Sequence, residues 1–221
     1  MPPTADASPD LLGITIAHRA MIGDARRFAD MLEGIAQGSS PCDRRRAGAI
    51  AAYLGELCDS IHHHHTIEDE VMWQILIDAA GGAVDVHDLQ DDHAHLDPIL
   101  DQLRSTAIEF GEETDDSRTQ VAGALANVLE ALHELLAEHI ADEEKVVFPV
   151  VENYVSAEQW KVVEDAARKG SSMAFEVPRI GRYITRRERT RILGEGGLPM
   201  RLMLRWFEWT GARRERRITG R

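Results

Sequence analysis

Hydrophobic residues recur every three or four positions in four long stretches of the chain, and this spacing predicts four amphipathic helices. We expect these helices over about residues 8–37, 42–78, 86–110 and 118–148. Short segments rich in glycine, proline or acidic residues separate them: Gly38–Pro41, Ala79–Ala83 and Gly111–Ser117. Because short connections favour antiparallel neighbours, the pattern predicts an all-α, up-down-up-down four-helix bundle.

Local signals refine the helix ends. Ser8, followed by a proline, is typical of a helix start with Ser8 as the N-cap. Pro98 cannot donate a backbone hydrogen bond, so the third helix is expected to bend there, and Pro149 should disturb the fourth. Ser156 with a glutamine three residues later is a capping box, which predicts a short fifth helix.

Every predicted apolar stripe is interrupted by a histidine, and two stripes are also interrupted by a glutamate. The interrupting residues are His18 in the first helix, His64 and Glu68 in the second, His93 in the third, and His139 and Glu143 in the fourth. A buried carboxylate without a partner costs several kcal/mol, and a buried imidazole without partners is also unfavourable. The six residues therefore need a partner that satisfies them together.

Two segments of the chain match each other around these residues. Residues 64–73 and 139–148 both read His-x-x-x-Glu, then a second acid, then apolar residues ending in an aromatic one. Residues four apart share a helix face, so each pair offers one imidazole nitrogen and one carboxylate to the same point. Two such helices facing each other would hold two metal ions between them.

The residue types narrow the choice of metal. Imidazole and carboxylate ligands suit iron, manganese or zinc. Structural zinc sites use cysteine, and the chain has only Cys42 and Cys58, which form no CxxC motif. Six ligands are too many for one tetrahedral zinc ion, and they suit two ions with bridging carboxylates.

Other histidines have simpler interpretations. His18 taken alone would be a hydrogen-bonded core histidine. The run His62–His65 spans a full helical turn, so at most one or two of its members face the core and the others are solvated. His87, His95 and His133 lie off the apolar stripes and are expected at the surface.

Ferritin-like bundles hold two metal ions with a different arrangement of ligands. It uses Glu-x-x-His on two helices and one glutamate from each of the other two. Glu130-x-x-His133 fits this pattern, and Asp59-x-x-His62 nearly fits it. Both pairs lie off or at the edge of the stripes, and the first and third helices offer no matching inward glutamate, so the sequence favours the first arrangement.

Charge is distributed unevenly along the 221 residues, whose net charge is −13. Residues 179–221 contain 13 Arg and 4 Glu, a balance of +9, which leaves −22 for the rest of the chain. Nucleic acid is therefore not an expected partner of the acidic body. Since there is no signal peptide, no apolar run long enough for a membrane span and little cysteine, we expect a cytoplasmic protein.

The basic end of the chain predicts a second part of the molecule. We expect residues 1–155 to form the bundle and residues 156–221 an Arg-rich helical extension. Residues 198–217 combine apolar, aromatic and basic side chains, which is typical of a helix on an anionic membrane or on a partner. The simpler interpretation, which we favour, is a terminal helix that packs its Trp and Met side chains on the bundle while its Arg residues face the acidic surface.

In these histidines and glutamates, the chain resembles the hemerythrin-like (HHE cation-binding) family of non-heme diiron four-helix bundles. The resemblance covers about residues 10–155 and rests on the order and spacing of His18, His64-x-x-x-Glu68, His93 and His139-x-x-x-Glu143. It implies two iron ions, with the four histidines as terminal ligands and with Glu68 and Glu143 as bridges.

The chain departs from the oxygen-carrying members of that family. These have a second histidine four residues along on the third helix and His-x-x-x-x-Asp on the fourth, whereas this chain has Asp97 and Leu89 at the candidate positions and His-x-x-x-Glu. One terminal nitrogen is then missing, which argues against simple reversible oxygen carriage. We expect a redox or stress protein that reacts with peroxide, in a catalase-like manner, or with nitric oxide. The alternative is an iron or oxygen sensor, or an oxygen store, read by a partner through the tail.

Overall fold

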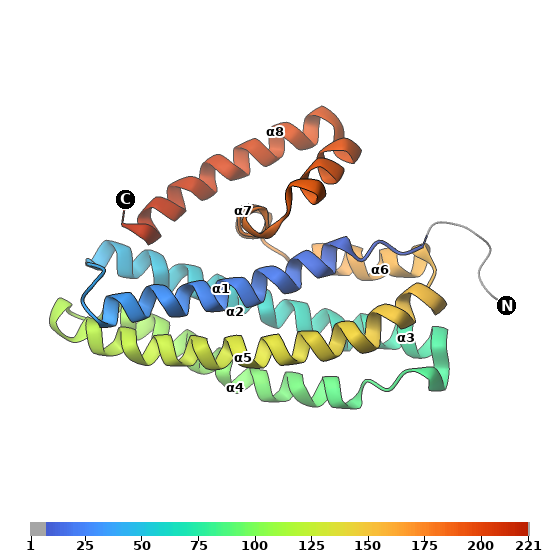
Figure 1. Ribbon diagram of the computed structural model, residues 1–221, viewed down its shortest axis with the longest axis horizontal. Helices are drawn as coiled ribbons and strands as arrows, with labels where there is room; N and C mark the ends of the chain where they lie inside the picture. Colours follow the sequence, from blue (N-terminus) through green and yellow to red (C-terminus); the bar gives the residue numbers. More distant parts are fainter. Residues whose placement is uncertain (1–7, 221) are drawn as a thin grey trace.

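The bundle predicted from the sequence is confirmed (Figure 1). The computed structural model describes residues 8–220, with the exception of the side chains at 83, 115, 116, 195, 196, 198–201 and 203. The bundle consists of α1 (Leu12–Ala36), α2 (Arg44–Ile67), α3 (Trp73–Ala80), α4 (His87–Glu112) and α5 (Asp115–Tyr154). Helix α1 packs against α5, and α4 packs against both α2 and α5. Consecutive long helices run in opposite directions.

The second long helix differs from the prediction in one respect. Instead of a continuous α-helix over 42–78, α2 passes through a π-helical turn at Glu68–Met72 before it continues as α3. Gly81, with φ of 56°, ends α3 and leads into a short 3-10 turn at Gly81–Ala83. Single π turns inside α-helices are frequent at functional sites, and this one begins at a predicted ligand.

The other helix ends differ from their predicted positions by a few residues. Helix α1 begins at Leu12, so Ser8 is not its N-cap, and the carboxylate of Asp10 accepts the Leu12 N–H at 3.0 Å just before the helix. The expected acidic loop shrinks to the residues between Glu112 and Asp115. Helix α4 contains Pro98, and α5 continues past Pro149 to Tyr154.

The hydrophobic core consists of two clusters with a polar layer between them. Ile61 on α2 belongs to one cluster and Met72, at the end of the π-helical turn, belongs to the other, and the predicted ligands lie between these positions. On α4, Leu96 and Leu89 flank His93 in the same way. The helices therefore place their histidines and glutamates at one level of the bundle, with apolar packing above and below.

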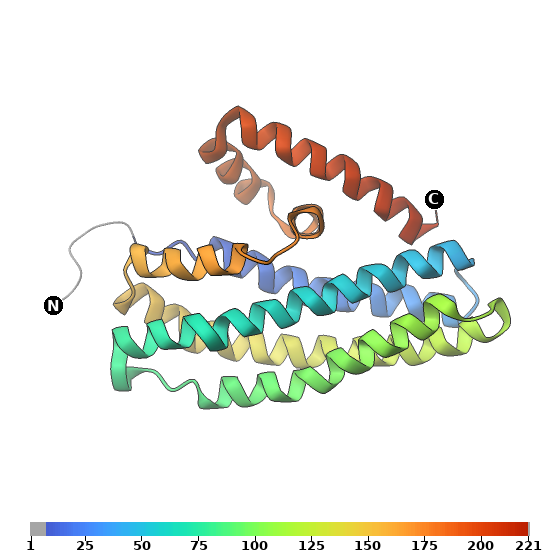
Figure 2. The same cartoon turned by 180° about the vertical axis from the view of Figure 1, so that it is seen from behind.

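Three more helices form the C-terminal extension: α6 (Ala157–Arg168), α7 (Met173–Tyr183) and α8 (Arg186–Thr219). The predicted capping box of Ser156 and Gln159 starts α6. Gly197, with φ of 62°, interrupts α8. Figures 1 and 2 show α7 and α8 lying over the side of the bundle formed by α1 and α2, and none of the helices in the described part of the chain is apolar and long enough to cross a membrane.

Buried hydrogen bonds and an ion pair connect the extension to the bundle. Asp24 on α1 is fully buried and accepts hydrogen bonds from Tyr53 at 2.8 Å, Tyr183 at 2.7 Å and Arg179 Nε at 2.9 Å. Phe175 of α7 joins the main core cluster. The division into a 1–155 bundle and a 156–221 extension stays a prediction, although α5 ends close to the proposed boundary.

Helix α8 meets the bundle differently from the expectation. Ile218 and Phe207 are buried, and Arg214 binds Glu56 at 2.5 Å. Trp206 and Trp209, which we expected against the bundle, are 58% and 55% exposed. The methionines at 200 and 203 lie outside the described side chains.

Candidate metal centre

The polar layer brings the predicted ligands of four helices together. Their donor atoms form two groups, and within each group all donors lie within 4.8 Å of one another. The first group, called the His18 group, contains His18, His64, Glu68 and Glu143. The second, called the His65 group, contains His65, Glu68, His93 and His139. All six residues singled out in the sequence lie in this layer, together with His65.

Glu68 belongs to both groups. Its Oε1 lies 2.7 Å from His64 Nε2, and its Oε2 lies 3.4 Å from His93 Nε2. The two oxygens of one carboxylate therefore face the two groups, as a bridging ligand requires. Glu143, the other expected bridge, has Oε2 3.3 Å from His18 Nε2 and is part of the His18 group only.

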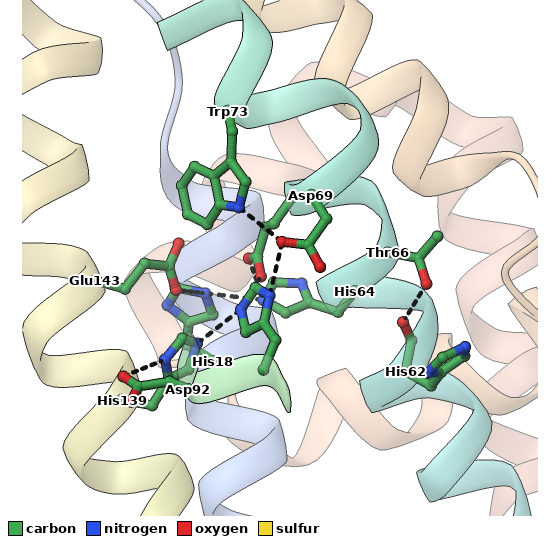
Figure 3. A network of polar contacts seen from close by, with 11 residues as sticks. His18, His62, His64, Thr66, Asp69, Trp73, Asp92, His139 and Glu143 are labelled. Atoms are coloured by element: carbon green, nitrogen blue, oxygen red, sulfur yellow. Dashed lines mark hydrogen bonds and ion pairs between the residues drawn. The ribbon is translucent and has the colours of Figure 1, made fainter. Parts of the chain in front are cut away.

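His65 is the residue that the sequence analysis did not single out. It is 4% exposed, and its ring stacks on His93 with 4.3 Å between the ring centroids. His62 is exposed and lies apart from the cluster in Figure 3, where its carbonyl accepts a hydrogen bond from Thr66. The signal for His65 was its spacing, since Glu68 is three residues from His65 and four from His64, and both spacings share a helix face.

His65 changes the ligand count that the sequence suggested. Five imidazoles line the layer instead of four. His65 on α2 therefore provides the additional nitrogen that the sequence of the third helix lacks. His87 and His95 are exposed, as expected. His133 is partly buried, with Nδ1 3.3 Å from the carbonyl of Ile22.

The ferritin-like alternative does not assemble. The Glu130 carboxylate accepts a hydrogen bond from Arg26 at 2.7 Å, and the Asp59 carboxylate accepts one from Arg104 at 2.6 Å. Neither acid belongs to the two groups of possible ligands found in the described part of the chain.

Carboxylates behind three of the histidines fix their ring orientation. His18 Nδ1 lies 2.9 Å from a carboxylate oxygen of Glu144, and His93 Nδ1 lies 3.0 Å from one of Asp69. His139 Nδ1 lies 3.3 Å from one of Asp92. Trp73 Nε1 also donates to Asp69, at 2.9 Å, as Figure 3 shows. A histidine that donates Nδ1–H to a carboxylate keeps a lone pair on Nε2, which is the arrangement found around protein-bound metals.

This orientation leaves the inner nitrogens without a suitable partner in the protein. His93 Nε2 and His139 Nε2 lie 3.2 Å apart, and each ring has its Nδ1 directed at a carboxylate. Two neutral rings of this tautomer direct lone pairs at each other. A cation between the two nitrogens would turn this repulsion into coordination.

The burial of the cluster also changes the pKa values of its glutamates and histidines. Removal from water raises the pKa of Glu68 and Glu143 well above the usual range, and the neighbouring Asp69 and Glu68, respectively, raise them further. Burial also lowers the pKa of His139 to about 4 and that of His65 well below its usual value. The protein alone thus favours an uncharged cluster, and a cation would favour the ionised carboxylates.

Several buried atoms of the cluster lack hydrogen bonds. Both ring nitrogens of His65 and all four carboxylate oxygens of Glu68 and Glu143 have no hydrogen-bond partner within the described residues. Each such group costs about 1–3 kcal/mol when left unsatisfied. The donor set, its burial and these unsatisfied atoms fit a site for metal ions.

Helix bundle and polar layer together define a metal-binding protein with histidine and carboxylate ligands. Residues 14–151 match the family described as the hemerythrin HHE cation-binding domain, so the chain belongs to this family. The family binds metal ions, typically iron. No curated protein and no solved structure matches the chain. Helices α6, α7 and α8 lie beyond the matched residues.

Proposed function

We propose that this chain holds two iron ions in the polar layer and reacts with hydrogen peroxide or nitric oxide, in a redox or stress role. The observation that carries the proposal is the pair of four-residue groups that share Glu68. One ion would be held by His18, His64 and Glu143, and the other by three histidines. Glu68 would bridge them. Manganese or zinc could bind the same donors, and the experiment below distinguishes the metals.

The donor set suits redox chemistry. Two iron ions held by these donors would supply two-electron redox chemistry towards a small molecule bound beside them. Glu68 and Glu143 favour the more highly charged state, because anionic ligands stabilise positive charge. Each group offers four protein donors, which leaves coordination positions for a small ligand.

The first experiment is metal analysis of the purified and reconstituted protein with an optical spectrum. We expect about two irons per chain and near-ultraviolet charge-transfer bands in the oxidised form, whereas zinc would show none. The second is the addition of hydrogen peroxide, which should be decomposed by the iron-loaded protein or should oxidise its reduced form.

Reversible oxygen binding is the outcome that contradicts the redox proposal. The air-exposed protein is placed under inert gas without a reductant. Repeated recovery of a colourless, reduced form would identify an oxygen carrier, and the proposed reaction with peroxide or nitric oxide would then be abandoned.

One observation favours a sensor as a second candidate. His63, next to the ligand His64, lies against the extension: its Nε2 is 3.1 Å from the carbonyl of Ala167 at the end of α6. Metal occupancy could therefore change the exposure of α6. Hydrogen exchange in α6 that differs between iron-loaded and iron-free protein, without turnover of peroxide, would favour the sensor.

A further inference from the structure

A cleft connects the metal centre with the C-terminal extension. It has a volume of about 310 Å³, lies between α1, α2, α6 and α7, and reaches His64 and Glu68. His64 keeps 18% of its side chain exposed, more than its partners in the His18 group. The His18 group is therefore the part of the centre that faces the cleft.

Most of the cleft wall is apolar. The bundle contributes Ile14, Met21, Ile67 and Met72, and the extension contributes Trp160, Val163, Val177 and Ile180. The extension lies beyond the residues that match the family, so this wall is a feature of the present chain. Polar and charged residues also line the cleft: Asp10, Ser60, His63, Glu164, Arg168, Ser171, Glu176 and Arg179.

The wall is held in place independently of any ligand. Arg179 on α7 is buried and binds both Asp24, at 2.9 Å, and Glu176, at 2.7 Å. Trp160 on α6 is also buried, and it donates its indole N–H to the carbonyl of Asp10 at 3.1 Å. The cleft is thus a preformed site, as is usual for small-molecule sites.

The size of the cleft exceeds what hydrogen peroxide or nitric oxide needs. A water molecule occupies about 30 Å³ of the liquid, and each of these ligands has only two heavy atoms. Sites for organic ligands are concave, mostly apolar and roughly 300–1,000 Å³ in volume. The volume and lining of this cleft belong to that class.

We propose that the cleft binds an apolar organic hydroperoxide, with its apolar body against α6 and α7 and its peroxide end towards His64 and Glu68. This proposal rests on the proposed function and names its substrate class. In the reaction the O–O bond breaks, two electrons from the reduced iron pair and two protons from solvent are taken up, and an alcohol and water are released.

The kinetic test compares cumene hydroperoxide with hydrogen peroxide as oxidants of the reduced, iron-loaded protein. Val177→Trp fills the cleft, and Val162→Trp is the matched control because Val162 is 53% exposed on α6 and lies outside the cleft. We expect Val177→Trp to slow the organic oxidant roughly tenfold or more, with the rate for hydrogen peroxide changed less than about twofold. Val162→Trp should change neither rate.

A binding test uses the zinc-loaded protein and 2-phenyl-2-propanol, the alcohol that the reaction would release. The methyl resonances of Met21 and Met72 should shift, whereas that of Met31, which lies outside the cleft, should not. If hydrogen peroxide reacts but Val177→Trp has no effect and the methyl groups do not shift, the cleft proposal is wrong and the proposed function stands. Methyl shifts without a reaction with either oxidant would retain the binding site and overturn the hydroperoxide as its substrate.

A second inference comes from the outer face of α8. Leu202, Trp206 and Trp209 follow one another at spacings of four and three residues and are 61%, 58% and 55% exposed. We call these three residues the outer stripe. Phe207 and Ile218, which are buried, lie on the opposite face of the helix. Ile218 belongs to the main core cluster, whereas the outer stripe is exposed, with Trp206 also lining a hollow beside α7.

Basic residues accompany the outer stripe. Arg213 lies over the Trp209 ring at 4.1 Å, and a hollow of about 520 Å³ next to it is lined mainly by arginines. Its lining residues are Asp43, Arg45, Arg46, Arg213, Arg216, Arg217 and Gly220. Two acids of α8 are engaged elsewhere, since Glu208 pairs with Arg189 and Glu215 pairs with Arg27 and Arg182.

We infer that the outer stripe and the basic hollow bind an anionic lipid bilayer. Tryptophan is favoured at the interface between water and lipid, and each arginine near an anionic surface adds to the attraction. The contacts of Arg214 with Glu56 and of Arg46 Nε with the Ile218 carbonyl, at 2.8 Å, hold α8 on the bundle while its outer face remains available.

Sedimentation with vesicles tests this inference on the full chain. Phosphatidylcholine vesicles with about 30% phosphatidylglycerol should bind the protein, and vesicles of phosphatidylcholine alone should not. Trp206→Gln with Trp209→Gln, and separately Arg213→Gln with Arg216→Gln and Arg217→Gln, should abolish binding. The control Arg168→Gln with Arg186→Gln and Arg187→Gln removes the same charge elsewhere on the extension and should retain it.

Equal binding to neutral and anionic vesicles, or none to either, would overturn the inference. So would retention of binding in the double tryptophan variant, or capture of a protein partner that competes for the stripe while vesicles fail to bind. Melting temperatures of the variants should match the wild type, because all the substituted side chains are exposed.

Discussion

Two neighbouring histidines on one helix belong to different groups of possible metal ligands. Consecutive residues of an α-helix point about 100° apart, so His64 and His65 cannot reach the same point. Glu68 lies one turn further along and has one oxygen towards each group. The end of α2 and the start of the π-helical turn therefore provide candidate ligands to both groups and the carboxylate between them.

The first prediction concerns His65. His65→Ala should reduce the metal content from about two ions per chain to about one, because the His65 group would retain only three donors. His62→Ala, on the same helical turn, should leave the content unchanged, since His62 is exposed. Elemental analysis of the reconstituted variants provides the measurement. Equal loss of metal in both variants would show that His65 has no ligand role.

The second prediction concerns pH. The raised pKa values of Glu68 and Glu143 mean that, without metal, these carboxyls are protonated in the fold at a pH where the unfolded chain has ionised them. As pH rises above the usual carboxyl value of about 4.3, they therefore subtract stability from the metal-free protein. Metal binding displaces these protons, so the stabilisation by metal should increase with pH.

The corresponding measurement is the melting temperature with and without a chelator between pH 5 and pH 8. The difference between the two curves should grow with pH. In Glu68→Gln, which has no proton to displace at this position, the pH dependence should be weaker. A difference that stays constant across this range would contradict the coupling between metal and these two carboxyls.

At the scale of the element, the helices were the most predictable part of the chain. Helical spacing is local, and residues such as Leu96 and Leu103, both buried, already mark the inner face of α4 in the sequence. The π turn at Glu68–Met72 was not predictable, because no residue type distinguishes it from an α-helical turn. Similarly, Trp206 and Phe207 are neighbours in the sequence of α8, and the sequence alone cannot say that Phe207 is buried while Trp206 is exposed.

The metal centre was predictable to a similar degree and for related reasons. His18, His93 and His139 interrupt apolar stripes, so their spacing along the helices predicts that they are buried. His65 follows directly after a residue of the stripe, and its inward position depends on how the neighbouring helices surround α2. Asp69, Asp92 and Glu144, which orient the rings, are each only one residue from a ligand, but acidic residues are so common on these helices that spacing alone did not identify them.

The third prediction concerns the packing of α7 on α1. A Cβ atom on Gly23 would overlap the ring of Tyr183, whose hydroxyl binds Asp24. Gly23→Ala should therefore shift α7 and destabilise the fold by about 1–3 kcal/mol. Gly13→Ala, in the same helix and with open space around the added methyl group, is the control. Denaturant unfolding of both variants measures the difference, and equal stability would mean that Tyr183 moves aside without cost.

At the scale of the whole molecule, a buried ion pair joins the bundle and the extension. The fourth prediction is that Arg179→Met costs about 3–5 kcal/mol, because it removes the nearer cation of the buried Asp24 carboxylate and leaves only Arg27, 3.9 Å away. Asp24→Asn combined with Arg179→Met should recover much of this loss, since no buried charge then remains. Thermal unfolding distinguishes the two outcomes. A double variant as unstable as the sum of the single ones would show that charge pairing is not the cause.

The fifth prediction concerns the proposed division of the chain. Residues 1–155 contain every member of both ligand groups, so this fragment should still bind about two metal ions. It should melt at a lower temperature than the full chain, because Phe175 and Ile218 no longer complete the core. Metal analysis and thermal unfolding of the fragment are the measurements. A fragment that fails to fold or to bind metal would show that the bundle is not an independent domain.

The contact of Asp24 with Arg179 also has a consequence for how such chains change over evolutionary time. Asp24 is fully buried, and its nearest cation is Arg179 at 2.9 Å, on a helix beyond the residues that match the family, whereas Arg27 of its own helix is 3.9 Å away. Loss of α7 would remove the nearer cation and the Tyr183 hydroxyl from this buried acid, so Asp24 and Arg179 should be inherited or lost together. Relatives without the extension are expected to carry an uncharged residue in place of Asp24. The residue at this one position of the bundle would then indicate whether a relative has the helices that form the other wall of the cleft beside the candidate metal centre.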